Sequence, residues 1–207
     1  MLDQIGALLN QIYDVKAIIQ WGGYAALVFI VFAETGLMIG FFLPGDSLLV
    51  TAGLFAATGV LDIWTLLFLL IPAAIIGDAV NYYIGKKLGT ALYERKDSRF
   101  FRKAHLLKAK AFYDKHGGKT IVLARFVPVV RTFAPTVAGV SGMSYPAFAM
   151  YNILGAILWV GSMTGIGYFL GNTVPDIEKN IIFVIAIVIF LSFLPAIYEL
   201  WKHGRKR

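Results

Sequence analysis

Apolar stretches long enough to cross a bilayer recur along this chain, separated by short polar links. Residues 63–85, 147–172 and 181–201 each provide the roughly 20 residues that a membrane-spanning helix needs. We therefore predict transmembrane helices over these three ranges. In residues 1–20 apolar side chains recur at helical spacing, which predicts an amphipathic N-terminal helix lying on the membrane surface.

Two further apolar runs, residues 21–60 and 120–140, are interrupted by charges and prolines. The interrupting residues are Glu34, Pro44, Gly45 and Asp46 in the first run and Arg125, Pro128, Arg131 and Pro135 in the second. A charge at the membrane centre costs about 2.5–3.5 kcal/mol, and broken backbone at that depth persists only where protein buries it or water reaches it. We interpret both runs as re-entrant helical hairpins that enter and leave on one side. The hairpin tips are predicted at Pro44, Gly45, Pro128 and Pro135.

The two hairpin regions also resemble each other. The stretch FFLPGDSLLVTAG at 41–53 resembles RFVPVVRTFAPTVAG at 125–139, and YYIG at 82–85 resembles YFLG at 168–171. Each repeat would be a hairpin followed by one crossing helix, so the second copy would be inverted, as in many secondary transporters. The predicted fold is an all-α polytopic membrane protein, an inverted repeat with two re-entrant helical hairpins that meet near the bilayer midplane.

Composition and charge agree with this architecture and orient it. The 207 residues are 58% hydrophobic and 15% charged and include no cysteine, which predicts a single membrane domain over 1–207 without disulfides. Residues 86–119 hold eleven Lys or Arg, and the tail after Trp201 holds four more. Basic loops stay in the cytoplasm, so we place both segments there, with an interfacial helix within 86–119. Anionic lipid heads explain this basic segment without nucleic acid, and the side of the N-terminus is left open.

Nearly all the charge predicted inside the membrane belongs to Glu34, Asp46, Asp78, Arg125 and Arg131. The forked guanidinium donors of arginine suit phosphate, so Arg125 and Arg131 are candidates for binding a substrate phosphate. The three acids are candidates for proton coupling or gating. Other roles stay open: Arg125 could reach the interface, Asp46 could cap the helix that follows, and Asp78 could form only a structural ion pair.

The remaining polar residues do not favour an enzyme. The three histidines lie in polar segments, and none accompanies a serine or an acid at metal or triad spacing. We predict no catalytic residues, no metal and no cofactor. Asn81 and Tyr82 are expected to support packing or hydrogen bonds. The glycine-rich stretch at 151–171 could support a homodimer.

Three motifs carry a family resemblance. The stretches ETGLMIGFFLPGDSLLVTAG, GDAVNYYIGKKLG and HGGKTIVLARFVPVVRTFAPTVAGVSGMSYPAF resemble the DedA family of bacterial inner-membrane proteins, which is related to VTT-domain lipid transporters and scramblases. The resemblance spans roughly residues 21–172. It implies that Glu34, Asp46, Arg125 and Arg131 match acids and arginines that the family requires. It also implies a multi-pass protein of the bacterial cytoplasmic membrane that supports envelope integrity, with sensitivity to membrane potential and pH.

The residues and the resemblance together predict a flippase or translocase of a phosphate-headed lipid, with recycling of undecaprenyl phosphate as the leading hypothesis. Its partners would be membrane lipids, the polyprenyl phosphate and protons, whose movement could be coupled to transport. Two alternatives remain: a broad phospholipid flippase or scramblase, and a proton-coupled exporter of small cations or drugs. A polyprenyl pyrophosphate phosphatase is disfavoured because the chain lacks a serine-arginine-serine motif after a proline-glycine pair.

Overall fold

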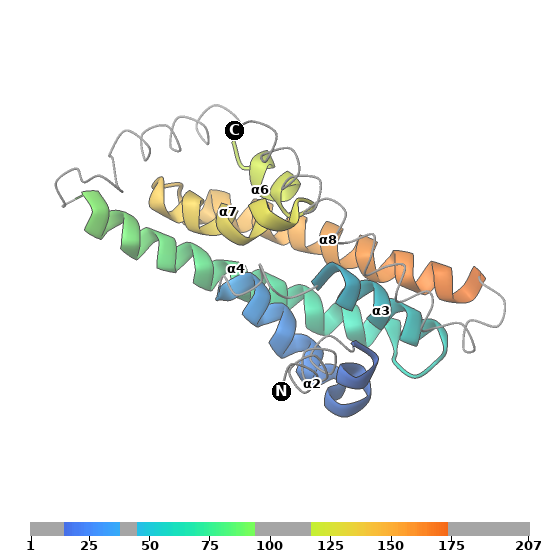
Figure 1. Ribbon diagram of the computed structural model, residues 1–207. Coiled ribbons are helices and arrows are strands. Elements are labelled where there is room, and N and C mark those ends of the chain that lie inside the picture. The colour runs from blue at the N-terminus through green and yellow to red at the C-terminus, as the bar shows by residue number, and fades with distance from the viewer. Residues whose placement is uncertain (1–14, 38–44, 94–116, 174–207) are drawn as a thin grey trace, which may run out of the picture. The chain divides into compact units, whose positions relative to one another are not determined.

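The chain folds into helices throughout the part that the structure describes. The computed structural model describes residues 15–37, 45–93 and 117–173 (Figure 1). Its helices are α2 (Val15–Gly36), α3 (Gly45–Ala57), α4 (Ile63–Tyr93), α6 (Lys119–Ala124), α7 (Pro128–Val140) and α8 (Tyr145–Thr173). The described residues therefore confirm the predicted all-helical class.

Helices α4 and α8 are each long and apolar enough to cross a membrane. The apolar part of α4, Ile63–Gly89, has 27 residues and extends about 40 Å, against a hydrocarbon core of about 30 Å. Trp64 and Phe68 of α4 and Phe169 of α8 are among the most exposed large apolar side chains. Such side chains are costly in water, whereas in a bilayer they face lipid.

The region of the first predicted hairpin contains two shorter helical pieces. Helix α2 bends at Gly23, whose φ of 51° and ψ of −150° are not helical and suit only glycine. Its apolar part, Gly22–Gly36, and helix α3 are both too short to cross a bilayer. The path between them stays a prediction, because residues 38–44 lie outside the described residues.

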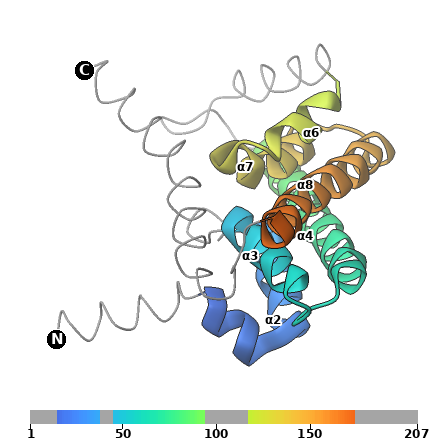
Figure 2. The ribbon, with the colours of Figure 1, turned by 90° about the vertical axis from the view of Figure 1, so that its right-hand side faces the viewer.

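Contacts divide the chain into two compact units, and each is described by itself. Unit 1 comprises residues 1–30, 43–70 and 160–207. In this unit α3 lies against the C-terminal part of α8 (Figure 2). A Cβ atom built on Gly53 would lie 2.8 Å from the backbone nitrogen of Tyr168, and one built on Gly167 would lie 1.9 Å from the carbonyl oxygen of Val50. Glycine is therefore required where the two backbones touch.

Unit 2 comprises residues 31–42 and 71–159 and has its own apolar core. That core is formed by Tyr82, Ile121, Ala124, Ala134, Ala138 and Phe148. The ring of Tyr82 stacks on Phe148 with centroids 4.6 Å apart, and its hydroxyl donates to the carbonyl of Met143. This agrees with the packing and hydrogen-bonding role expected for Tyr82.

The sequence repeat is matched by repeated packing. Gly139 of α7 packs on α4 in unit 2, where an added Cβ atom would lie 2.1 Å from the carbonyl oxygen of Tyr82. Gly53 and Tyr168 make the corresponding contact in unit 1, and both the glycines and the tyrosines lie 86 positions apart. Helices α3 and α7 thus pack on α8 and α4, respectively, in each case the spanning helix of the other predicted repeat.

Helices α6 and α7 form a tight helical hairpin around residues 125–127. The backbone N–H groups of Phe126 and Val127 donate to the carbonyls three residues earlier, at 3.2 and 3.0 Å. Pro128 is the first residue of α7, where a missing N–H costs nothing. Pro135, predicted at the tip, lies instead inside α7. A proline there removes one intrahelical hydrogen bond, which membrane helices tolerate when neighbouring helices supply other partners.

The other predicted segments are described to different extents. The predicted spanning ranges 63–85 and 147–172 lie within α4 and α8. Helix α4 continues to Tyr93, so the first residues of the basic segment are helical. Three segments lie wholly or largely outside the described residues: the amphipathic helix at 1–20, the interfacial helix within 86–119 and the spanning helix at 181–201.

Candidate functional site

Four of the five predicted membrane charges come together in unit 2. Glu34 lies near the end of α2, Asp78 lies in α4, Arg125 follows α6, and Arg131 lies in the first turns of α7. All four side chains are less than one-tenth exposed. They form two ion pairs, Arg125 with Asp78 and Arg131 with Glu34. The sequence predicted these charges but not which acid pairs with which arginine.

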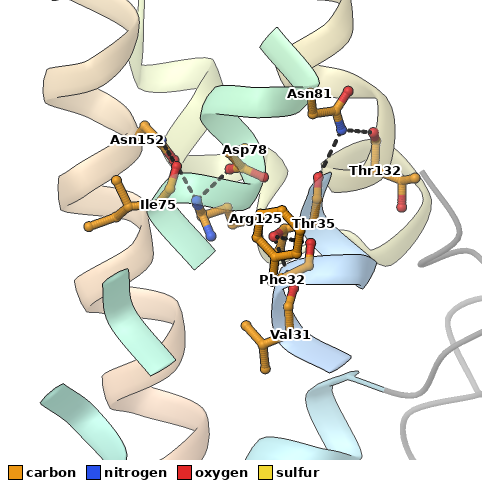
Figure 3. A network of polar contacts seen from close by, with 9 residues as sticks. All are labelled: Val31, Phe32, Thr35, Ile75, Asp78, Asn81, Arg125, Thr132 and Asn152. Atoms are coloured by element: carbon orange, nitrogen blue, oxygen red, sulfur yellow. Dashed lines mark hydrogen bonds and ion pairs between the residues drawn. The ribbon is translucent and has the colours of Figure 1, made fainter. Parts of the chain in front are cut away.

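Arg125 is held by two partners on different helices (Figure 3). Its guanidinium donates to the Asp78 carboxylate of α4 and, at 2.5 Å, to the amide oxygen of Asn152 on α8. Asn152 in turn donates to the carbonyl of Ile75 at 3.0 Å, which fixes the orientation of its amide. Arg125 is therefore buried within the described residues, with its charge paired. The Asp78 ion pair that the sequence left open is present.

The Arg125 side chain also depends on a glycine of α8. A Cβ atom built on Gly155 would lie 2.9 Å from Cδ and 3.1 Å from Nε of Arg125. Contacts that short would displace the arginine, so a hydrogen at this position lets its side chain pass. The Nε atom is buried and has no hydrogen-bond partner among the described residues. It is a donor that a ligand oxygen could engage.

Asn81 ties together the two helices that carry the second ion pair. Its amide nitrogen donates to the carbonyls of Thr35 on α2 and Thr132 on α7, at 2.9 and 3.0 Å (Figure 3). Thr35 and Thr132 directly follow Glu34 and Arg131 in the sequence. The hydroxyl of Thr136 donates to the Asn81 amide oxygen. The hydrogen-bonding role expected for Asn81 is confirmed. Its bonds hold the backbone directly after Glu34 and directly after Arg131.

Helices α2 and α4 approach closely beside these pairs. A Cβ atom built on Gly77 would lie 1.9 Å from the hydroxyl oxygen of Thr35 and 3.0 Å from the carbonyl oxygen of Phe32. On the facing helix, one built on Gly36 would lie 3.1 Å from Cα of Gly77. Two glycines thus let the backbone next to Asp78 touch the backbone next to Glu34.

One tryptophan ring serves both arginines. The guanidinium carbons of Arg131 and Arg125 lie 4.8 and 5.8 Å from the ring centroid of Trp159, which is completely buried on α8. Each cation is attracted to the electron-rich face of the ring, by about 0.5–2 kcal/mol depending on desolvation. The ring thereby holds two like charges near one point without neutralising either.

The charged side chains surround a small cavity. Its volume is about 10 Å³, room for no more than a water molecule. It is lined by Glu34, Thr35, Asp78, Arg125, Arg131 and Thr132. A phosphate group could enter only if the carboxylates released the arginines. Removing one partner of a buried ion pair costs about 3–5 kcal/mol, so such exchange needs a replacement for the lost charge.

The chemistry of this cluster is that of anion binding with proton-accepting groups nearby. Arginine forks match phosphate oxygens, and a carboxylate that loses its arginine can take a proton instead. Among the described residues, no group of three or more His, Cys, Asp or Glu could hold a metal ion.

The other predicted site residues lie elsewhere. Asp46 lies in the first turn of α3, in unit 1, and Gly45 is the first residue of that helix. Pro44 lies outside the described residues. The roles predicted for these residues stay predictions.

Sequence reasoning missed Asn152 and Trp159. Both lie in the run at 132–175, which contains no charged residue, so a search for buried charges does not point to them. The available signal was chemical: Asn152 is an isolated amide in an apolar helix, and such groups usually hydrogen-bond to another helix.

Comparison with known proteins identifies relatives over most of the chain. The VTT domain family matches residues 43–169. The chain is 50% identical to Protein DedA of Escherichia coli K12 over 184 residues, covering 88% of this chain and 84% of that protein. It is 46% identical to the uncharacterized membrane protein ML0287 of Mycobacterium leprae, over 86% and 79% of the two chains. It is 37% identical to the inner membrane protein YqjA of Escherichia coli K12, over 72% and 68%. No solved structure matches.

Proposed function

Because this chain belongs to the DedA family of VTT-domain membrane proteins, a family linked to membrane transport, we propose that it is a flippase for a phosphate-headed lipid. The substrate we propose is undecaprenyl phosphate, returned from the outer to the inner leaflet of the bacterial cytoplasmic membrane. The basic segment at 86–119 and the C-terminal tail would face the cytoplasm, where the excess of Lys and Arg favours them.

The observation that carries this proposal is the pair of buried arginines beside one cavity. Arg125 and Arg131 approach the same tryptophan ring, and both line the same cavity. Two guanidinium groups that converge on one cavity suit a terminal phosphate, because its several oxygens can accept hydrogen bonds from both within a small volume. An uncharged lipid would gain nothing from burying them.

The same pairing makes a small-cation exporter less suitable. Glu34 and Asp78 are each engaged by an arginine, so a cation approaching them would meet a positive charge first. Such an exporter needs accessible acids and has no use for buried arginines. A broad phospholipid flippase uses the same arginines, and only head-group selectivity separates it from the proposed function.

Lipid movement in proteoliposomes tests the proposal. Labelled polyprenyl phosphate would be placed in one leaflet and followed into the other, with and without a pH gradient. We expect the wild type to move it and Arg131→Ala to fall to the level of protein-free vesicles. Arg131→Lys keeps the charge but loses the fork, so we expect it to recover little of the rate.

The matched control is Lys119→Ala, which removes an exposed cation from the start of the same hairpin and should retain the wild-type rate. Movement at the wild-type rate by Arg131→Ala would exclude Arg131 from the mechanism. No movement by the wild type would overturn the proposed function. Unlabelled phosphatidylglycerol that competes as well as polyprenyl phosphate would favour the broad flippase, and release of free phosphate would indicate a phosphatase.

A further inference from the structure

The charges around the cavity of unit 2 cancel. Its lining contains two acids, Glu34 and Asp78, and two arginines, Arg125 and Arg131. From α8, Asn152 and Trp159 contact these arginines, and neither side chain titrates. The formal charge of the described lining is therefore zero while all four groups are ionised.

This balance restricts how an anion can bind. Each guanidinium donates to a carboxylate, and the cavity has room for no more than a water molecule, so a phosphate that enters must displace Glu34, Asp78 or both from the arginines. A displaced carboxylate would then be buried in the protein without its counter-charge, which is among the costliest arrangements in proteins. Binding one proton per displaced carboxylate removes that cost.

We propose, resting on the proposed function above, that the site takes up one proton for each negative charge of the incoming head group. A phosphomonoester dianion would displace both carboxylates and bind with two protons, one on Glu34 and one on Asp78. A phosphodiester monoanion would displace one carboxylate and bind with one proton. No covalent bond forms or breaks, and the loaded site keeps the zero charge of the empty one.

Two consequences follow from this exchange. Because the loaded and empty sites carry equal charge, crossing the membrane moves no net charge through the electric field. The pH gradient, rather than the membrane potential, would then drive transport. The site would also distinguish a monoester from a diester by the number of protons each requires, although both present phosphate oxygens to the same arginines.

Counting protons on binding tests the proposal. The full-length protein in detergent micelles would be titrated calorimetrically with farnesyl phosphate at about pH 8, well above the second phosphate pKa of about 6. Repeating the titration in buffers of different ionisation heat gives the protons taken up per molecule bound. We expect about two protons for farnesyl phosphate and about one for its methyl diester. Because binding takes up protons, the affinity should fall as pH rises, by about 100-fold per pH unit for farnesyl phosphate and about 10-fold for the diester.

Two variants remove one carboxylate each. Asp78→Asn and Glu34→Gln keep the side-chain shape but leave one arginine without an acid, so each should lower the count for farnesyl phosphate from about two to about one. Because either variant alone could fail to fold, both are made. Asp62→Asn is the control, since Asp62 is exposed at the start of α4 and its loss should leave the count at two.

The outcomes separate this inference from the proposed function. Equal counts for the two probes, a count of zero, or no binding of either probe would overturn the inference. If vesicles transport lipid but the proton count is zero, the function stands and the inference fails. If the counts are about two and one but no lipid moves, the inference stands and the flippase proposal fails. In vesicles that do transport, a rate set by an imposed membrane potential instead of the pH gradient would also overturn it.

Discussion

Replacing Asn81 by leucine should separate helices α2 and α7 from α4 within unit 2. The substitution keeps the approximate size of the side chain but removes three hydrogen bonds, to Thr35, Thr132 and Thr136. The carbonyl of Thr35 is among the last four of α2, which have no donor inside the helix. Removing the Asn81 amide therefore leaves this carbonyl without that hydrogen bond.

The magnitude follows from these three bonds. Hydrogen bonds between membrane helices average about 0.6 kcal/mol and reach about 1.7 kcal/mol, so Asn81→Leu should lower the free energy of unfolding by about 2–5 kcal/mol. Unfolding by sodium dodecyl sulfate in mixed micelles, followed by tryptophan fluorescence, measures the difference. Asn172→Leu is the control, because Asn172 is exposed and its side chain bonds only the nearby Tyr168 carbonyl, at 2.8 Å, among the described residues.

A loss below about 0.5 kcal/mol, the range of ordinary surface substitutions, would show that Asn81 does not join the helices as described. Equal losses for Asn81→Leu and Asn172→Leu would point to a general effect of removing an amide. A large loss with unchanged lipid transport would show that Asn81 supports the fold without positioning the ion pair.

Three further predictions concern single contacts. Gly155→Ala should displace Arg125 from its partners and slow lipid movement in vesicles about tenfold or more, the value of one charge-assisted hydrogen bond. Gly161→Ala is the control and should leave the rate unchanged, because its added Cβ atom meets nothing within 4 Å. Trp159→Leu should weaken farnesyl phosphate binding about 2- to 30-fold in calorimetry, and Trp159→Phe should recover part of the loss because phenylalanine keeps an aromatic face. Asp62 accepts hydrogen bonds at 2.7 Å from the hydroxyl and the backbone N–H of one threonine, which lower its pKa. Its stabilising effect is therefore present at neutral pH and lost as pH falls through that lowered pKa, so Asp62→Asn should flatten the acid side of the melting-temperature profile; an unchanged profile would contradict the cap.

The sequence allowed the class of fold and the charged cluster to be predicted for definite physical reasons. Charges in apolar runs are costly to bury. Four such residues are therefore expected to pair with one another or to contact water: Glu34, Asp78, Arg125 and Arg131. Their pairing could not be predicted, because either acid satisfies either arginine equally well on paper. The choice depends on where α2 and α4 touch, which the small residues Gly36 and Gly77 set.

Neutral groups and proline positions were less accessible to sequence reasoning. In the sequence, Trp159 cannot be distinguished from a tryptophan that faces lipid. Only the structure shows that it is buried beside two arginines. Pro135 and Pro128 lie close together in the sequence, but one lies inside a helix and the other begins it. A proline indicates that one backbone donor is missing, and only the surrounding packing decides whether the helix ends there.

The crossed packing of the two repeats also determines the order in which the protein can assemble during translation. Gly53 contacts a residue 115 positions later, Tyr168, whereas Tyr82 contacts Gly139 only 57 positions later. At about 5–20 residues per second, a ribosome that has made Gly53 needs roughly 6–23 s to reach its contact residue. Unit 2 is therefore completed first. Helix α3, although made early, lacks its packing contact with α8 until α8 is synthesised.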